Sequence, residues 1–176
     1  MANLVFIAMS IDGYIATKDG DISWLESISN PDKSDFGYAR FMERIDAIVM
    51  GRQTFEKVMS FDVWPYTKKV FVLSSTLNAV PQKLLGKVEI INKRPIELVK
   101  HLSDLGMSDL YIDGGKTIQS FLKLELIDEM IISTIPIVLG EGIPLFAKQD
   151  HAIQFKHIET TAFNGGLVQT CYRKIS

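Results

Sequence analysis

The sequence has a single cysteine, Cys171, so an intramolecular disulfide is excluded. Doing without disulfides is typical of proteins from a reducing cytosol, and we predict a cytoplasmic location. Cys171 falls in an expected strand, where ordinary packing is a simpler interpretation than a reactive thiol. The N-terminus has no basic segment before its apolar run, which argues against a signal peptide. No apolar run approaches the roughly 20 residues that a membrane helix needs, so we expect no membrane partner.

The sequence also lacks a large excess of charge of one sign, since the formal net charge is −2. This near-neutral balance gives no reason to expect nucleic acid as a partner. Histidine is scarce as well: His101, His151 and His157 are scattered, and none has a nucleophile or ligand set beside it. We therefore expect no metal site and no Ser-His-Asp chemistry. The 47% hydrophobic content does suffice for a substantial core.

The first two thirds of the chain alternate between strand-like and helix-like segments. Pro95 suits the first turn of a helix that Gly106 would end, and Tyr38, Phe41 and Ile45 lie on one face of another. Alternation of this kind indicates parallel βαβ units. Continuous apolar runs predict buried strands at residues 4–9, 46–51, 69–75, 88–91 and 109–115.

The last third reads differently, with strand-like segments at 128–140, 153–159 and 167–175 and no convincing helix between them. Asn164-Gly165-Gly166 is a turn cluster that would join the last two as an antiparallel hairpin. We predict an α/β fold: a single three-layer domain over residues 1–176, with a mostly parallel mixed sheet and an antiparallel C-terminal hairpin.

A double glycine, Gly114-Gly115, stands where the strand "LYID" turns into a helix that begins near Lys116. Glycine there allows positive φ and the close approach of a ligand, and a helix N-terminus favours phosphate. A plain tight turn explains the pair equally well. Two known phosphate motifs fail. A Walker A loop would need glycine at Leu110, and the dinucleotide fingerprint beginning at Gly140 would need it at Leu145.

Two other expected strands end in a similar way. Gly51 closes one, followed by Arg52 and by Thr54, which we interpret as the cap of the next helix. Ser74 and Ser75 follow another, where an ST-turn at Ser75 is the alternative to a ligand site. Since parallel strands end at one edge of the sheet, where open α/β sheets bind ligands, the three junctions together predict a ligand site.

These segments, in this order, resemble the dihydrofolate-reductase-like superfamily. The motifs are "IAMSIDGYIA", "IVMGRQTFE", "VFVLSST" and "YIDGGKTIQSFL". "LIDEMIISTIPIVLGEGIPLF" is similar to the branch typified by the reductase domain of the riboflavin-biosynthesis deaminase/reductase. The resemblance covers nearly the whole chain and implies NADPH as cofactor. By matching motifs it implies that the cofactor lies against Ala8, Ile15, Ala16, Gly51, Arg52, Gln53, Thr54, Leu73, Ser74, Ser75, Gly114, Gly115, Lys116, Thr117 and Ile118.

The expected chemistry is hydride transfer to a small, flat heterocycle with a C=N or C=O bond, which requires little acid–base machinery. The catalytic residues we predict are Asp35, as an acid, and Trp24, as a wall for the ring; Asp12 and Asp113 are further candidate acids. Each has a structural alternative: a helix-terminal charge for Asp35 and a core residue for Trp24. Tyr14 stands where reductases of the riboflavin pathway typically have a lysine, which weakens assignment to 5-amino-6-(5-phosphoribosylamino)uracil as substrate.

Two other functions stay open: a nucleotide-binding module without turnover, and a true dihydrofolate reductase. Lys93-Arg94 is either a second site for a 2′-phosphate or a solvated pair. The family also suggests a homodimer, for which the apolar segment "IISTIPIVL" (131–139) is the surface we predict.

Overall fold

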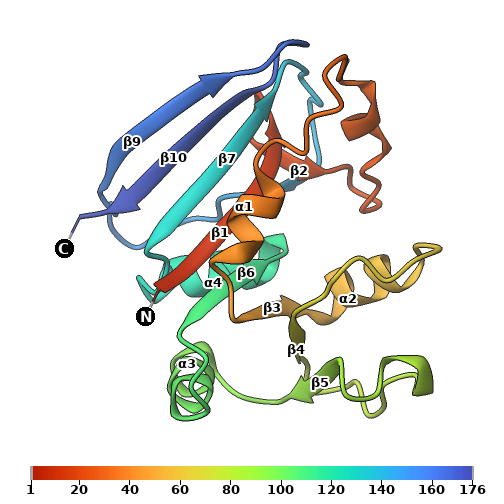
Figure 1. Cartoon of the computed structure of the whole chain (residues 1–176). Coiled ribbons are helices and arrows are strands. Elements are labelled where there is room, and N and C mark those ends of the chain that lie inside the picture. Colours follow the sequence, from red (N-terminus) through yellow and green to blue (C-terminus); the bar gives the residue numbers. More distant parts are fainter. Residues whose placement is uncertain (1, 176) are drawn as a thin grey trace.

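Eight strands form one mixed sheet through the length of the molecule (Figure 1), in a computed structural model that describes residues 2–175. The first six strands across the sheet run parallel, whereas the last two form an antiparallel hairpin at one edge. This confirms the fold class expected from the sequence. In spatial order they are β5 (Val88–Ile91), β4 (Lys69–Leu73), β3 (Ala47–Gly51), β6 (Asp109–Asp113), β1 (Ala2–Ser10), β7 (Glu129–Ile135), β10 (Val168–Lys174) and β9 (Phe155–Ala162).

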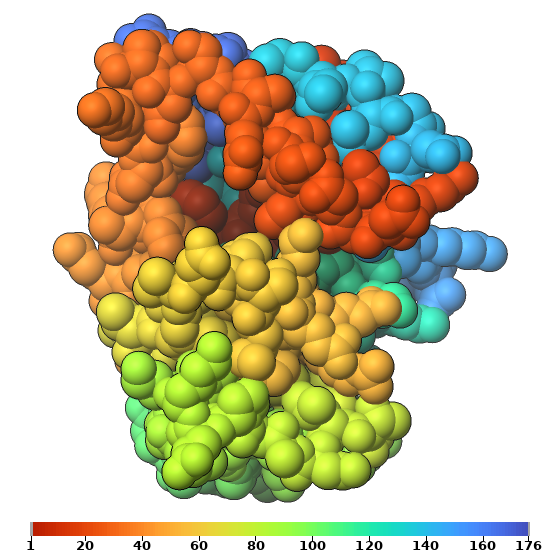
Figure 2. Space-filling view, turned by 90° about the vertical axis from the view of Figure 1, so that its right-hand side faces the viewer, coloured from red at the N-terminus to blue at the C-terminus, as the bar shows by residue number. Residues whose placement is uncertain are grey.

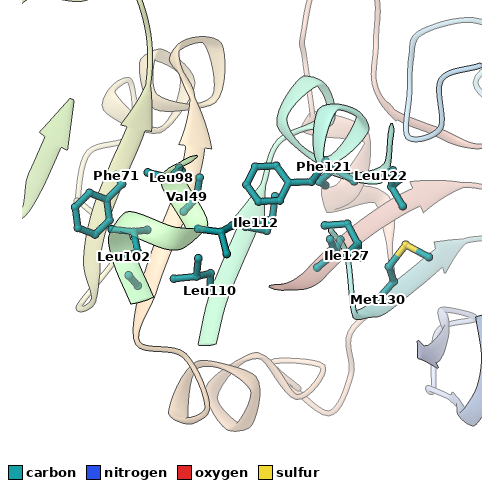
Figure 3. Packing of buried hydrophobic residues seen from close by; sticks show 14 of the residues in the cluster. Val49, Phe71, Leu98, Leu102, Leu110, Ile112, Phe121, Leu122, Ile127 and Met130 are labelled. Atoms are coloured by element: carbon teal, nitrogen blue, oxygen red, sulfur yellow. The ribbon is translucent and has the colours of Figure 1, made fainter. Parts of the chain in front are cut away.

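Helices cover both faces of the sheet and complete the three layers. On one face, Leu98 and Phe121 pack with Val49 and Ile112 of the sheet (Figure 3). On the other face, Phe41 and its neighbours form a second cluster. Full burial of a leucine or phenylalanine is worth about 2 kcal/mol, so the two clusters explain why the helices dock. The first face carries α3 (Pro95–Asp104) and α4 (Gly115–Lys123), and the second carries α1 (Tyr38–Glu43) and α2 (Arg52–Met59).

Helix α3 begins and ends where its sequence indicated. Pro95 occupies the first turn, where its missing N–H costs nothing, and Glu97 accepts a hydrogen bond from the backbone N–H of Arg94. Gly106, with φ of 80°, follows the last turn. None of the helices formed by residues 2–175 is long and apolar enough to cross a membrane.

The segment after β7 departs from the expected strand. The strand ends at Ile135 rather than continuing to 140, because Pro136 has no N–H to donate to a ladder. Asp12 then holds the chain in a bend, its carboxylate accepting N–H groups from Leu139 and Gly140. The chain goes on to form a small second sheet, β2 (Tyr14–Ala16) with β8 (Ile143–Pro144), which had no clear sequence signal. Two short 3-10 helices, η1 (Ser23–Ser27) and η2 (Gln82–Leu84), complete the elements.

Much of the predicted homodimer surface lies inside the subunit. The first half of segment 131–139 belongs to β7, which lies inside the sheet between β1 and β10. Within it Ile132 and Ile135 are buried in the subunit, and Val138 lies beyond the strand. The continuous apolar run therefore marks an interior strand, as such runs do in parallel sheets.

Candidate functional site

The sheet splits beside its central strand. β1 pairs with β6 only from Ala2 to Leu4, but with β7 from Leu4 to Ser10. On the β6 side of the split, the carbonyl of Phe6 accepts the Tyr111 hydroxyl at 2.9 Å. Because alternate residues of a parallel strand direct their peptide groups to the same neighbour, the N–H and C=O of Ala8 face this opening too. A peptide edge thus lies open in the middle of the sheet, near the carboxyl ends of its strands.

The N-termini of α2 and α4 meet at the same edge of the sheet. Gly114 has φ of 88°, and a Cβ added to it would overlap Thr54 Oγ1 of α2. A Cβ at Gly51 would lie 2.9 Å from Thr117 Oγ1 of α4. The two helices therefore approach more closely than side chains at these glycines would allow. This close approach, rather than a turn alone, accounts for the glycines.

Neither of these helix N-termini is capped by a side chain, and neither has an acidic residue in its first turn. The other two helices differ. The Asp35 carboxylate accepts N–H groups at the start of α1, and Glu97 lies in the first turn of α3. Free N–H groups and the helix dipole make α2 and α4 a paired site for an anion.

The interpretation of Thr54 as a helix cap is wrong. Helix α2 starts at Arg52 with Gly51 as its N-cap, so Thr54 is the third residue of the first turn. Its side chain instead fills the space that Gly114 leaves open.

The loop after β1 closes over the double glycine. A Cβ at Gly115 would lie 2.7 Å from Ile15 Cδ1, so the Ile15 side chain rests on the start of α4. Ala16 is buried, and its carbonyl leaves no room for a side chain at Gly142. This loop therefore forms one wall of the opening beside β1.

The junction after β4 lies next to the junction after β3, because Leu73 pairs with Gly51. Ser74 Oγ accepts N–H groups from Thr76 and Leu77, so a hydroxyl turn forms here, but at Ser74 and not at Ser75 as expected. The Arg52 guanidinium spans the two junctions: it donates to Thr76 Oγ1 at 2.9 Å and pairs with Glu56 at 2.8 Å. Its charge is thus held at the surface beside both strand ends.

The pair Lys93-Arg94 lies past β5, one strand farther along. Arg94 pairs with Glu97 of its own helix at 2.6 Å. Lys93 is exposed. The predicted cofactor residues that follow β1, β3, β4 and β6 are therefore brought together at one edge, with Lys93-Arg94 at its margin.

A hollow opens on the α1 and α2 side of the split (Figure 2). Dark red atoms of β1 lie at its bottom, with blue-green and blue atoms of the late strands behind them. The orange segment around α1, the red-orange loop after β1 and the gold segment around α2 surround it. Phe6, on β1, is only partly buried although it lies in the middle of the sheet, and its ring meets Tyr38 of α1 with centroids 5.6 Å apart.

An acid lies among tyrosines at this hollow. Asp113, the last residue of β6, accepts the Tyr66 hydroxyl at 3.1 Å. Burial raises the pKa of its carboxyl, and the hydrogen bonds from the Tyr66 hydroxyl and the Gly114 N–H oppose this shift. Burial and the nearby Asp113 charge raise the pKa of Tyr38 to about 12 and that of Tyr66 further still. Asp113 is therefore a carboxyl that holds its proton to higher pH than an ordinary aspartate.

The other predicted acids are engaged elsewhere. Asp35 is exposed, and hydrogen bonds from the Ala39 and Gly37 N–H groups lower the pKa of its carboxyl. The Ser10 hydroxyl, with the N–H groups of Gly140 and Leu139, likewise lowers the pKa of Asp12. Asp35 thus serves the start of α1, which is the structural alternative recognised in the sequence, and Asp12 holds the bend after β7.

Trp24 is buried in η1, in a cluster with Ile135 and Leu167 that also contacts Ala8. Its indole Nε1 is buried and has no hydrogen-bond partner within residues 2–175. Trp24 thus lies beside the opening, as part of the packing under the loop after β1.

The sequence did not indicate Tyr66, Ser133 or Gln169, which also lie around the hollow. Tyr66 sits in an irregular segment with no periodic pattern, and its partner Asp113 is 47 residues away. Residues 2–175 contain no group of three or more histidine, cysteine or acidic side chains placed to hold a metal ion.

A parallel sheet split beside its central strand, with two bare helix N-termini at its edge, defines an open α/β protein of the dihydrofolate-reductase-like class. The model of the RibD C-terminal domain matches residues 4–168, and the chain belongs to that family. A Shewanella sp. PV-4 protein, provisionally assigned to riboflavin biosynthesis, is 47% identical over the full length of both chains, with a TM-score of 0.96. The uncharacterized protein YwjB of Bacillus subtilis is 34% identical over 96% of this chain and 95% of its own.

The fold itself extends to more distant proteins. Dihydrofolate reductase from Enterococcus faecalis, in a complex with NADP(H) and RAB-propyl, superposes with a TM-score of 0.69 at 17% identity. The match covers 99% of this chain and 97% of that one. The dihydrofolate-reductase-like fold implied by the sequence motifs is thereby confirmed.

Proposed function

We propose that this protein is an NADPH-dependent reductase of a small, flat heterocycle with a C=N or C=O bond. The observation that carries the proposal is the contact between the bare N-termini of α2 and α4 at the edge of the split sheet. Helix N-termini bind phosphate, and two of them side by side suit the two phosphates of a dinucleotide pyrophosphate. Family membership and the NADP(H) complex of the enterococcal reductase support this choice of cofactor.

The three strand-to-helix or strand-to-turn junctions and the β1 segment would each contact a different part of the cofactor. Gly51 to Thr54 and Gly114 to Ile118 would hold the pyrophosphate, with Thr54 and Thr117 hydroxyls beside the glycines. The open peptide edge at Ala8, with Ile15-Ala16 across from it, would hold the carboxamide end. Leu73, Ser74 and Ser75 would border the adenosine, where the Arg52 guanidinium lies ready for a 2′-phosphate.

Once bound, the nicotinamide supplies a hydride to the substrate. The chain aligns the two rings in the hollow and keeps water from the opening beside Ala8. Asp113, whose carboxyl has a pKa raised by burial, is the acid that donates a proton to the nitrogen or oxygen that the reduction makes basic. Asp35 has its carboxylate committed to the start of α1, and Trp24 closes the wall near Ala8.

Thermal unfolding with NADPH, NADH or ATP at saturation tests the proposal. A ligand at 100 times its Kd adds about 2.7 kcal/mol, which raises the midpoint by about 5–10 °C for a chain of this size. We expect NADPH to give the largest shift. Absence of a shift with both nicotinamide cofactors would overturn the proposal. NADPH binding without oxidation by any reducible heterocycle would favour a binding module, and tight competitive binding of diaminopyrimidine antifolates a true folate reductase.

Substitution of Arg52 should separate NADPH from NADH. A charge-assisted hydrogen bond to a phosphate is worth about 1.5–3 kcal/mol, so Arg52→Ala should weaken NADPH binding by about 10–100-fold and leave NADH binding nearly unchanged. Lys93→Ala and Arg94→Ala are matched controls from the neighbouring junction. If one of them, rather than Arg52→Ala, removes the preference in a fluorescence titration, the phosphate lies beside β5.

A further inference from the structure

Two neutral polar side chains, Ser133 and Gln169, lie next to each other on the sheet face where the hollow opens. Ser133 of β7 pairs in register with Ala8 of β1 on one side and with Gln169 of β10 on the other. These three residues form a row across three strands. Since residues two apart on a strand share a face, the row lies on the face that carries Phe6, which is the face of the hollow (Figure 2).

The hydrogen bonds of Gln169 fix the orientation of its amide. Nε2 donates to Ser133 Oγ and to the carbonyl of Phe36, both at 3.0 Å. A backbone carbonyl can only accept, so the nitrogen must face it and both amide hydrogens are used. Oε1 takes part in no hydrogen bond within residues 2–175 and is not among the buried unpaired atoms. Oε1 lies 4.0 Å from the position that a Cβ at Gly37 would take, so Gln169 has a free acceptor beside the start of α1.

Ser133 supplies the complementary group. Its oxygen accepts from Gln169, and its own hydrogen has no acceptor in the described part of the chain. Ser133 is 4% exposed, so water has little access to serve as the missing acceptor for its hydroxyl hydrogen. The nearby indole N–H of Trp24, which is also buried, likewise lacks an acceptor. Donors left without acceptors beside Ala8 indicate a ligand that carries a carbonyl.

The row carries no charge. The nearest ionic group on these strands, Glu129, is bound by both Arg44 and Arg173 at 2.8 and 3.0 Å. An anionic substrate group here would lie against Gln169 Oε1 without a cation to compensate. The Ser133 hydroxyl is a free donor and Gln169 Oε1 is a free acceptor beside it. This pair matches the edge of a neutral ring in which an N–H lies next to a C=O.

We propose that Ser133 and Gln169 select the substrate by binding such a lactam edge. Gln169 Oε1 accepts the ring N–H, and the Ser133 hydroxyl donates to the adjacent ring carbonyl. The proposal rests on the proposed function, since it places the substrate ring beside Ala8. A site built around hydrogen bonds rejects an analogue that lacks them far more strongly than an apolar pocket does.

Lumazine and its 1,3-dimethyl derivative are suitable probes, because methylation removes both ring N–H groups and keeps the ring. With NADPH saturating, we expect wild type to bind lumazine at least 10-fold more tightly than dimethyllumazine in calorimetry. Ser133→Ala and Gln169→Met should each weaken lumazine binding and abolish the discrimination, with the Kd of NADPH unchanged. Thr134→Ala, one residue along β7 and on the other face, should keep it. If Gln169→Met fails to fold, Ser133→Ala carries the test.

Equal affinity for the two probes, or binding of neither while NADPH binds, would overturn the assignment of this pair. Discrimination that survives in both variants would do the same. Failure of NADPH itself to bind would instead overturn the proposed function, so the two failures are distinguishable.

Discussion

Gly114→Ala should be among the most damaging single substitutions in the chain. The glycine has φ of 88° and ψ of 139°, a backbone region that side chains avoid at a cost of about 1–3 kcal/mol. The new methyl group would also overlap Thr54 Oγ1. Together we expect a loss of about 3–5 kcal/mol in the free energy of unfolding, a fall of about 6–20 °C in the midpoint.

The effect on the cofactor should be larger than the loss of stability suggests. The methyl group pushes apart the N-termini of α2 and α4, and a misplacement of about 1 Å can cost about 100-fold in function. We therefore expect NADPH affinity to fall by about 100-fold, measured at a temperature where circular dichroism shows the variant folded.

Gly86→Ala is the matched control for backbone conformation. Gly86 has φ of 80°, but an added Cβ there meets nothing within 4 Å. This variant should lose about 1–2 kcal/mol and keep its NADPH affinity. The double variant Thr54→Ala/Gly114→Ala should regain part of the stability, because it removes the overlapping hydroxyl. If Gly114→Ala costs no more than Gly86→Ala, the helices are not in the tight contact described above.

Much of this site could be predicted because its parts are local in sequence. Buried strands show continuous apolar runs, and helices show an apolar stripe. Glycines mark the change from strand to helix after β3 and β6, and serines follow β4. Parallel strands then bring their carboxyl ends to one edge of the sheet, independently of the conformation of the loops. This reasoning placed Gly51, Ser74 and Gly114 at a common edge before any contact was known.

The rest depends on contacts that no local pattern encodes. The bend after β7 is held by Asp12, over 120 residues earlier, and the late apolar run looked like a surface because its neighbours in the sheet could not be identified. Threonine is a residue type that often caps helices, but the Thr54 hydroxyl lies in the space that Gly114 leaves open. Ser133 and Gln169 likewise become neighbours only through strand register.

Asp113→Asn should abolish most of the activity while stabilising the fold at pH values above the raised pKa of this carboxyl. Positioned acids contribute about 100- to 10,000-fold to rate, so we expect kcat to fall by at least about 100-fold with KM little changed. In the wild type, activity should decline as pH rises through the raised pKa of Asp113, because the carboxyl then loses the proton it donates. The variant should lack this limb of the pH–rate profile.

The folded state, unlike the activity, should gain from replacing Asp113 by asparagine. The pKa of Asp113 in the folded protein lies above its ordinary value near 3.8, so between the two values the folded state binds more protons than the unfolded state. Wild-type stability therefore declines as pH rises through that window and carries the full cost of the buried charge above it. The advantage of Asp113→Asn in thermal unfolding should be largest above the raised pKa of the folded state and shrink as the pH is lowered through that window.

Tyr66→Phe distinguishes a proton donor from a merely structural acid. The Tyr66 hydroxyl donates to Asp113 at 3.1 Å and thereby lowers the pKa of its carboxyl. Its removal should move the alkaline limb of the pH–rate profile to higher pH, an effect that a purely structural role would not produce. The same profile for Asp35→Asn decides between the two acids. Asn caps a helix as well as Asp does, so this variant should keep the limb; loss of the limb there, with retention in Asp113→Asn, would make Asp35 the proton donor.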